Sequence, residues 1–306
     1  METALALGGL VLGIALIVGG AEAFVDGLLG VGSRLRTSPF VLVVLLSGFE
    51  LENLAAGIAA NAKGLPGAAA GTVFGGVTFL ALGVAGLGAV IAPIEANLPK
   101  GFLLWTAISP LPTLILSLDG DLSRLDGALL LIWFVVALIA VARTGRAILY
   151  DDAPKKQRLS LLRLTGGLAV LTLGGNLLGD SIRSTVSRLG VSDTLLGNTA
   201  IAASVEAEEV GRVAVPARRG RPELALGNIA GTIVHFIAFN AAVIALVKPL
   251  SLDSATRALH LPVSVAATFV FCALIGFRGR LSRVDGVALV ALYGAYAAVA
   301  IVVAVA

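Results

Sequence analysis

The chain has 306 residues, of which 58% are hydrophobic and only 13% are charged, and its mean hydropathy is +0.98. Soluble globular domains carry about 25% charged residues, so this composition excludes a water-soluble globule and predicts a helical membrane protein. The net charge of +3 does not indicate a nucleic-acid partner, because the basic residues are spread over short loops without interleaved aromatic residues. A single cysteine excludes an internal disulfide and a thiolate metal cluster.

Apolar runs of about 20 residues, enough to cross roughly 30 Å of hydrocarbon, recur along the whole chain. Because these runs are continuous and do not alternate between apolar and polar residues, they predict α-helices and not a β-barrel. The first run follows a Met-Glu-Thr-Ala start without basic residues, so we interpret it as a retained helix and not as a cleaved signal peptide. In chain order the predicted spans are residues 5–30, 39–62, 67–93, 100–117, 125–145, 160–184, 193–215, 223–248, 260–277 and 284–305.

The second predicted span contains glutamates, and its sequence recurs without a gap 156 residues later (206 minus 50). Charged side chains at membrane depth are costly and mark functional sites, so a duplicated acidic segment predicts a cation site. The identical pairs are Glu50/Glu206, Glu52/Glu208, Gly64/Gly220, Pro66/Pro222, Ala69/Ala225, Gly71/Gly227 and Gly75/Gly231.

The basic residues predict how the chain crosses the membrane. Most of the 22 Lys and Arg residues lie in connections that follow odd-numbered spans, so this side is expected to be cytoplasmic and both termini to lie outside. Five spans per half is an odd number, so the second half enters the membrane from the opposite side. The predicted fold is therefore an all-α polytopic membrane protein of ten spans, with inverted five-helix repeats at 1–148 and 161–306 and a cytoplasmic linker at 149–160.

Helical spacing predicts which polar groups face each other. Positions three apart share a helix face, which places Glu50 beside Asn53 and Glu206 beside Glu209, whereas Glu52 and Glu208 are expected to point elsewhere. Three carboxylates and one amide oxygen form a hard ligand set suited to Ca²⁺, Mn²⁺, Mg²⁺ or Na⁺. Such carboxylates need protons or cations to compensate their charge, and this competition is the basis of antiport. The predicted ion-binding residues are Glu50, Asn53, Glu206 and Glu209, with the three glutamates as metal ligands.

A second group of residues is predicted to support this site. Glycines four residues apart allow close helix approach and leave carbonyl groups accessible where a helix bends; the alternative is that they only pack. Arg212 follows Glu209 by three residues and is expected either to pair with it or to reach the cytoplasmic surface. The predicted bend glycines are Gly71, Gly75, Gly227 and Gly231, and the predicted supporting or proton-carrying groups are Glu52, Glu208, His235, Thr72, Asn228 and Thr232. For His235 the alternative is a structural hydrogen bond.

These segments resemble the Ca²⁺/cation antiporter superfamily, which includes the sodium/calcium and proton/calcium exchangers. The signature Gly-Thr-Ser-x-Pro-Glu of that family falls on residues 48–53 and 204–209, and its Gly-Asn-x-x-Gly-Ser falls on 71–76 and 227–232. The resemblance implies a multi-pass protein of the cell membrane that exchanges Ca²⁺ or a similar divalent cation for H⁺ or Na⁺. It also implies the ten-helix inverted-repeat fold, no cofactor and no enzymatic activity. The oligomeric state stays open.

The chain departs from the family pattern inside both signatures. Asn53 stands where the family usually has its key glutamate, and acidic residues replace the serine and proline of the signature in both halves. The gain of titratable acids favours proton coupling. Two alternatives remain: a Na⁺/H⁺ exchanger that does not use divalent cations, and a membrane-embedded metal-dependent enzyme. The enzyme is disfavoured because the sequence has no His-Glu-x-x-His pattern and Asp151-Asp152 is a single acidic pair.

Overall fold

The computed structural model describes residues 2–48, 50–95, 97–146, 148, 159–187 and 207–305, and these residues are almost entirely helical. Helices of membrane-spanning length and apolar composition confirm a multi-pass membrane protein. Within the described residues there are 7 such helices: Gly8–Leu35, Pro66–Ile91, Arg124–Thr144, Ser160–Leu178, Pro222–Val247, Thr256–Arg278 and Arg283–Val303.

The first half of the chain folds as a series of long and broken helices with two short strands. In order, its elements are α1 (Glu2–Leu35), α2 (Pro39–Leu46), α3 (Leu51–Ala62), α4 (Pro66–Ala70), the π-helix η1 (Gly71–Gly75), α5 (Gly76–Thr78), the π-helix η2 (Phe79–Val84), α6 (Ala85–Ile91), β1 (Ile94–Glu95), α7 (Lys100–Ile108), α8 (Leu111–Leu116), β2 (Asp121–Leu122) and α9 (Arg124–Thr144).

The second half has a similar order of elements. They are α10 (Ser160–Ser187), α13 (Ala207–Arg218), α14 (Pro222–Val234), the π-helix η4 (His235–Asn240), α15 (Ala241–Val247), β3 (Leu250–Ser251), the π-helix η5 (Thr256–His260), α16 (Leu261–Arg278), β4 (Arg280–Leu281) and α17 (Arg283–Val305).

The predicted count of ten spans is not confirmed, because three of the predicted spans are not continuous helices of membrane length among the described residues. Span 39–62 is divided into α2 and α3, and Glu50 between them has φ −91° and ψ 84°, outside the helical region. Span 100–117 is divided into α7 and α8 at Ser109-Pro110, where a proline cannot continue the hydrogen-bond ladder of α7. Most of span 193–215 lies outside the described residues, and the part that is described, from residue 207, belongs to α13.

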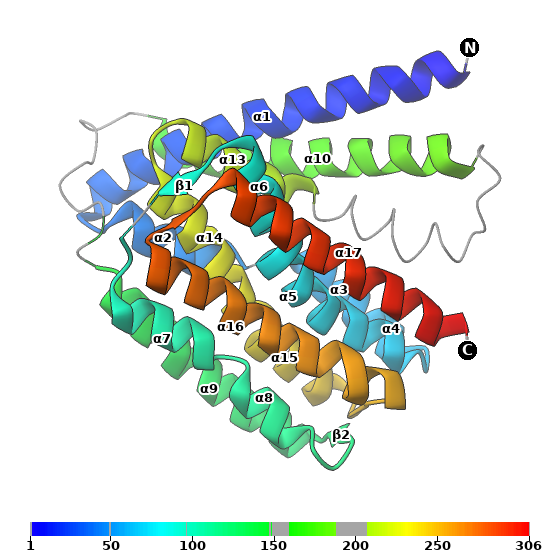
Figure 1. Ribbon diagram of the computed structural model, residues 1–306. Coiled ribbons are helices and arrows are strands. Elements are labelled where there is room, and N and C mark those ends of the chain that lie inside the picture. Colours follow the sequence, from blue (N-terminus) through cyan, green and yellow to red (C-terminus); the bar gives the residue numbers. More distant parts are fainter. Residues whose placement is uncertain are drawn as a thin grey trace.

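Helices α1 and α10 lie side by side along one edge of the molecule (Figure 1). Glycines allow their backbones to approach closely: a Cβ atom at Gly20 would lie 2.7 Å from the backbone nitrogen of Leu171. Both helices also contact α13, so this pair rests against the helix that carries Glu208 and Glu209.

Several elements of the two halves correspond at the spacing of the sequence repeat. Helices α3 and α13 begin and end 156 residues apart (207 minus 51), and the same shift relates η2 to η4 and α6 to α15. The short strands pair across the halves, since β1 pairs with β4 and β2 pairs with β3, both antiparallel. The labels of β1 and β2 in Figure 1 lie at opposite ends of the bundle. At each end, therefore, one strand from the first half pairs with one strand from the second half.

Helix α14 forms the centre of the core. Its side chains from Leu224 to Val234 are all buried, as expected for a helix that is surrounded on every side. It contacts α2 and α13, and the acidic residues lie beside these two elements. The core therefore brings the broken end of α2 and the start of α13 to a common position.

Candidate cation site

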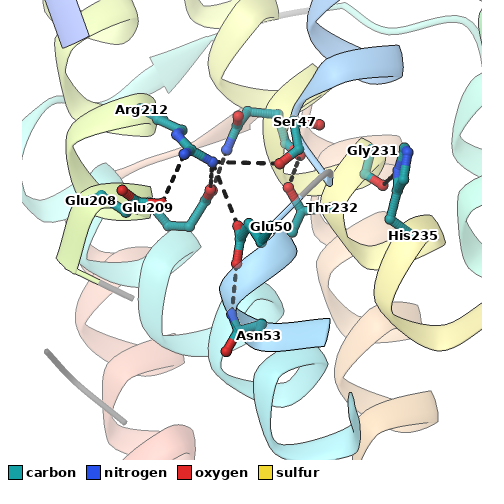
Figure 2. Close-up of polar contacts among 10 residues, drawn as sticks. Ser47, Glu50, Asn53, Glu208, Glu209, Arg212, Gly231, Thr232 and His235 are labelled. Atoms are coloured by element: carbon teal, nitrogen blue, oxygen red, sulfur yellow. Dashed lines mark hydrogen bonds and ion pairs between the residues drawn. The ribbon is translucent and has the colours of Figure 1, made fainter. Parts of the chain in front are cut away.

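Three glutamates from distant parts of the chain meet inside the protein. One oxygen from each of Glu50, Glu208 and Glu209 lies within 4.8 Å of the others, and all three residues are buried. We call these three residues the carboxylate cluster. Figure 2 shows them converging on a single arginine from two sides. Carboxylates gathered in this way provide oxygen ligands for a hard cation.

Helix ends explain how buried carboxylates are tolerated here. Glu50 occupies the N-cap position of α3, and Glu208 and Glu209 lie in the first turn of α13. The N-terminus of a helix carries a partial positive charge from its free N–H groups, which stabilises nearby anions. The interruption after α2 creates one of these helix ends within an apolar run, so the break in the second predicted span builds the site.

Arg212 joins the three carboxylates. Its Nη2 lies 2.7 Å from Glu208 Oε1, its Nη1 lies 3.5 Å from Glu50 Oε1, and Nη1 also donates a hydrogen bond to Glu209 Oε1. The same nitrogen lies 3.4 Å from the carbonyl oxygen of Ser47. The side chain is only 3% exposed, so one guanidinium compensates part of the cluster's charge in an environment with little water.

Two amide side chains border the carboxylate cluster. Asn53 Nδ2 donates to Glu50 Oε2 at 2.7 Å, and Asn228 Nδ2 donates to Glu209 Oε2. The Oδ1 atom of Asn228 is buried and accepts no hydrogen bond from any described residue, while its backbone carbonyl accepts from Thr232 Oγ1 at 3.0 Å. Amide oxygens are neutral ligands of the kind that hard cations accept beside carboxylates.

The structure brings together most, but not all, of the residues predicted from the sequence. Glu50 and Asn53 lie beside each other, as helical spacing predicted, and Glu209 from the second half lies close to Glu50. Glu206 falls outside the described residues, and only the backbone of Glu52, in α3, is described.

The expectation that Glu208 points elsewhere is wrong. Its side chain joins the carboxylate cluster because Arg212 follows Glu208 by four residues and Glu209 by three. Both spacings bring side chains together on a helix, so one guanidinium holds the two neighbouring carboxylates on adjacent sides of α13. The expected pairing of Arg212 with Glu209 is confirmed.

His235 and Thr72 make local contacts. His235 Nδ1 lies 2.8 Å from the carbonyl oxygen of Gly231, and its ring packs edge-on against Phe134 with a centroid distance of 4.9 Å. In Figure 2 the ring lies apart from the carboxylates, next to Gly231. Thr72 Oγ1 donates to the carbonyl oxygen of Ala69 at 2.8 Å. The two hydrogen bonds lie within single helical segments, and the ring contact joins η4 to α9. A proton-carrying role for His235 stays a prediction.

The predicted bend glycines behave differently in the two halves. A Cβ atom at Gly231 would lie 2.7 Å from the carbonyl oxygen of Val44, and one at Gly227 would lie 2.9 Å from the side chain of Phe40. In contrast, a Cβ at Gly71 or Gly75 would meet nothing within 4 Å. Of these four glycines, the two in α14 are therefore the ones that close approach to α2 requires, and this approach brings the broken end of α2 to the carboxylate cluster.

Two contacts of the site were not predicted from the sequence. The carbonyl of Ser47 accepts from Arg212 because α2 has ended at Leu46, and the Arg212 guanidinium lies over the ring of Phe24 in α1, 6.0 Å from its centroid. A backbone carbonyl or an aromatic residue in an apolar segment gives no signal of this kind, since both contacts depend on tertiary packing.

Comparisons with known proteins agree on one family. The family model described as "Sodium/calcium exchanger protein" matches residues 5–143 and 159–302. The putative antiporter CaxA of Alkalimonas amylolytica is 27% identical over 303 residues, which cover 93% of this chain and 95% of that protein. The uncharacterized membrane protein MJ0091 of Methanocaldococcus jannaschii is 26% identical, over 94% of this chain and 96% of that protein. A structure of the sodium-calcium exchanger NCX_Mj, soaked with zero Na⁺ and Ca²⁺, matches with a TM-score of 0.79 at 25% identity and covers 94% of this chain and 96% of that one.

Proposed function

Because the chain belongs to the sodium/calcium exchanger family, we propose that it is a secondary active antiporter that exchanges Ca²⁺, or a similar divalent cation, for H⁺ or Na⁺. The observation that carries the proposal is the carboxylate cluster, three buried carboxylates supplied by two segments that are far apart in the sequence. Oxygen donors of this kind bind hard cations. Protons and Na⁺ compete with the divalent cation for the same oxygens. One site therefore binds the transported cation and the coupling ion in turn.

The ligands that we propose for the cation come from both halves of the chain. Glu50 and Glu209 provide carboxylate oxygens, and the amide oxygen of Asn228 is free of other hydrogen bonds from described residues. Asn53 holds Glu50 through a hydrogen bond of 2.7 Å and is a further candidate ligand. Glu206 stays a candidate by its equivalence to Glu50 in the repeat.

We further propose that the chain forms two inverted repeats of five spans around this site. The crossed pairing of β1 with β4 and β2 with β3 supports a pseudo-twofold relation, because each pairing becomes the other when the halves are exchanged. Packing contacts follow the same rule: a Cβ at Gly57 would meet Ile244, and a Cβ at Gly88 would meet Val213, which are the equivalent positions.

This symmetry suits alternating access. Inverted repeats with broken helices at the ion site are the architecture of secondary transporters that expose one site to each side in turn. The broken connection between α2 and α3 lies at the proposed site. The distribution of basic residues supports a cytoplasmic linker at 149–160 and termini on the outside. The protein is placed in the cell membrane, with inorganic cations as its substrates.

Radioactive Ca²⁺ uptake into inside-out membrane vesicles tests the proposal. Uptake driven by an imposed H⁺ gradient or Na⁺ gradient is expected, and comparison of the two gradients identifies the coupling ion. The Glu209→Gln variant is expected to lose this uptake, whereas Glu95→Gln, at an exposed carboxylate in β1, is expected to keep it. Na⁺-driven proton movement without Ca²⁺ uptake would instead identify a Na⁺/H⁺ exchanger, and absence of all these fluxes would contradict antiport.

A further inference from the structure

Arg212 occupies the place that a bound cation needs. Its nitrogens contact the Oε1 atoms of Glu50, Glu208 and Glu209, so a cation that uses these oxygens together must displace the guanidinium. The arginine is carried by the same helix as two of the carboxylates and therefore cannot leave the site as a solute ion does. It is a positive charge that is always present at high local concentration.

The charges of these four side chains show what the arginine changes. Three ionised carboxylates and one guanidinium carry a net charge of −2, which one divalent cation neutralises. Arginine does not lose its proton under ordinary conditions, so its contribution to this balance is fixed. Without it, the carboxylates of an unloaded carrier would face the low dielectric of the membrane with no compensation from this helix, which raises the barrier to any movement of the empty site.

We propose that Arg212 is a tethered substitute for a coupling cation: it fills the carboxylate cluster in the unloaded carrier and allows this carrier to return without a cation from the other side. The inference rests on the antiport function proposed above and adds to it the residue that sets how strictly the two fluxes are coupled. Cation binding and arginine binding exclude each other at Glu50 and Glu209.

The structure provides a place for the arginine when a cation binds. Nη2 bonds Glu208 at 2.7 Å, and the guanidinium carbon lies 6.0 Å from the centroid of the Phe24 ring, on the side of α1. A guanidinium over an aromatic face keeps part of its stabilisation through a cation–π contact. Arg212 can therefore release Glu50 and Glu209 while it stays bound to Glu208 and Phe24.

Two fluxes measured in proteoliposomes with the full-length protein test this inference. Exchange of radioactive Ca²⁺ for unlabelled Ca²⁺ does not require an unloaded carrier to return, but net Ca²⁺ efflux into a Ca²⁺-free solution does. Both are measured without Na⁺, at one alkaline pH on both sides and with the membrane potential clamped. The wild type is expected to show both fluxes. In Arg212→Gln, net efflux is expected to fall at least about tenfold relative to exchange.

Ca²⁺ affinity provides a second readout that does not depend on transport. Removal of the tethered competitor in Arg212→Gln is expected to lower the Ca²⁺ concentration that half-saturates the increase in thermal stability of the purified protein. Arg218→Gln removes an exposed charge from the same helix and is expected to match the wild type in both measurements.

The possible results separate the inference from the function on which it rests. If the wild type exchanges Ca²⁺ but Arg212→Gln has the same ratio of net efflux to exchange and the same Ca²⁺ affinity, the inference is overturned and antiport stands. If the wild type shows no Ca²⁺ exchange, the proposed function fails. If Arg212→Gln does not fold, the Arg212→Lys variant replaces it in the test. This variant keeps the positive charge and is expected to keep net efflux. Loss of net efflux with Ca²⁺ exchange retained would overturn the inference.

Discussion

The two halves of the site share a backbone course but differ in chemistry. Helices α3 and α13 begin and end at equivalent residues of the repeat, yet α3 presents Glu50 and Asn53 where α13 presents Glu208, Glu209 and Arg212. In the described residues the second half therefore supplies two carboxylates and the compensating cation, and the first half supplies one carboxylate and an amide. The comparison teaches that symmetric packing positions the site and that its charge is divided unequally.

A substitution that removes one carboxylate charge from the second half should have the largest effect. Glu209→Gln removes the carboxylate that pairs with Arg212 and accepts from Asn228, and it leaves the guanidinium partly uncompensated in a buried position. Breaking a buried ion pair from one side costs about 3 kcal/mol, so we expect a loss of this order in the free energy of unfolding together with loss of Ca²⁺ transport. Denaturant unfolding in detergent and isotope flux measure the two effects.

The control for this prediction is Glu95→Gln, at an exposed carboxylate outside the site. A stable Glu209→Gln protein with wild-type flux would show that the cation does not use the carboxylate cluster.

The equivalent glycines Gly231 and Gly75 give the next largest expected difference between the halves. Gly231→Ala places a Cβ 2.7 Å from the carbonyl oxygen and 2.9 Å from the Cα of Val44, and such overpacking costs about 1 to 3 kcal/mol. The equivalent change Gly75→Ala meets open space and is expected to be neutral or to stabilise the helix by up to about 1 kcal/mol. Thermal unfolding of the two variants compares them directly, and an equal loss in both would contradict the asymmetry.

An acid at position 53 makes the first half resemble the second. In Asn53→Asp the hydrogen bond from Nδ2 to Glu50 is lost and a like charge takes its place, so we expect the Ca²⁺-free protein to lose about 1 to 2 kcal/mol of stability. A bound divalent cation relieves this repulsion, and the Ca²⁺-induced increase in unfolding temperature should be larger than in the wild type. A smaller increase would show that Asn53 does not face the bound ion.

The smallest expected effect lies at the partly exposed ion pairs of Asp26 in α1. Asp26 Oδ1 pairs with Arg219 at 2.7 Å, and its Oδ2 lies 3.8 Å from Arg163, but all three side chains are partly exposed. Exposed pairs contribute up to about 1 kcal/mol, so Asp26→Asn should change the unfolding free energy by less than this and leave Ca²⁺ exchange unchanged. A loss as large as that of Glu209→Gln would place Asp26 in the transport machinery.

The sequence predicted the part of the site that depends on local periodicity. The repeat indicated the acidic segments, and the spacing of three residues placed Glu50 beside Asn53, as the hydrogen bond between them confirms. Helical spacing alone failed for Glu208, because its direction is set by an ion pair with Arg212.

The fold was predictable to a similar extent. Seven predicted spans coincide with apolar helices of membrane length, since hydropathy reports directly on burial in lipid. The break between α2 and α3 was not predicted, although Gly48 and two glutamates lie there, because hydropathy averaged over a span does not locate an interruption and the close packing of Gly48 against His235 is a tertiary contact. Tertiary contacts of this type decide where a continuous apolar run stops being one helix.

The crossed strands have a consequence for biosynthesis. Ile94 and Glu95 of β1 pair with residues 281 and 280, which the ribosome adds near the end of the chain, so the early strand must wait for its partner while almost all other helices are inserted. Strand β2 meets its partner sooner, at residues 250 and 251. A truncated chain that ends before α16 would thus contain the β2–β3 pair at one end of the bundle but would lack β4, the partner of β1, at the other end. Both strand pairs form only when the polypeptide is nearly complete.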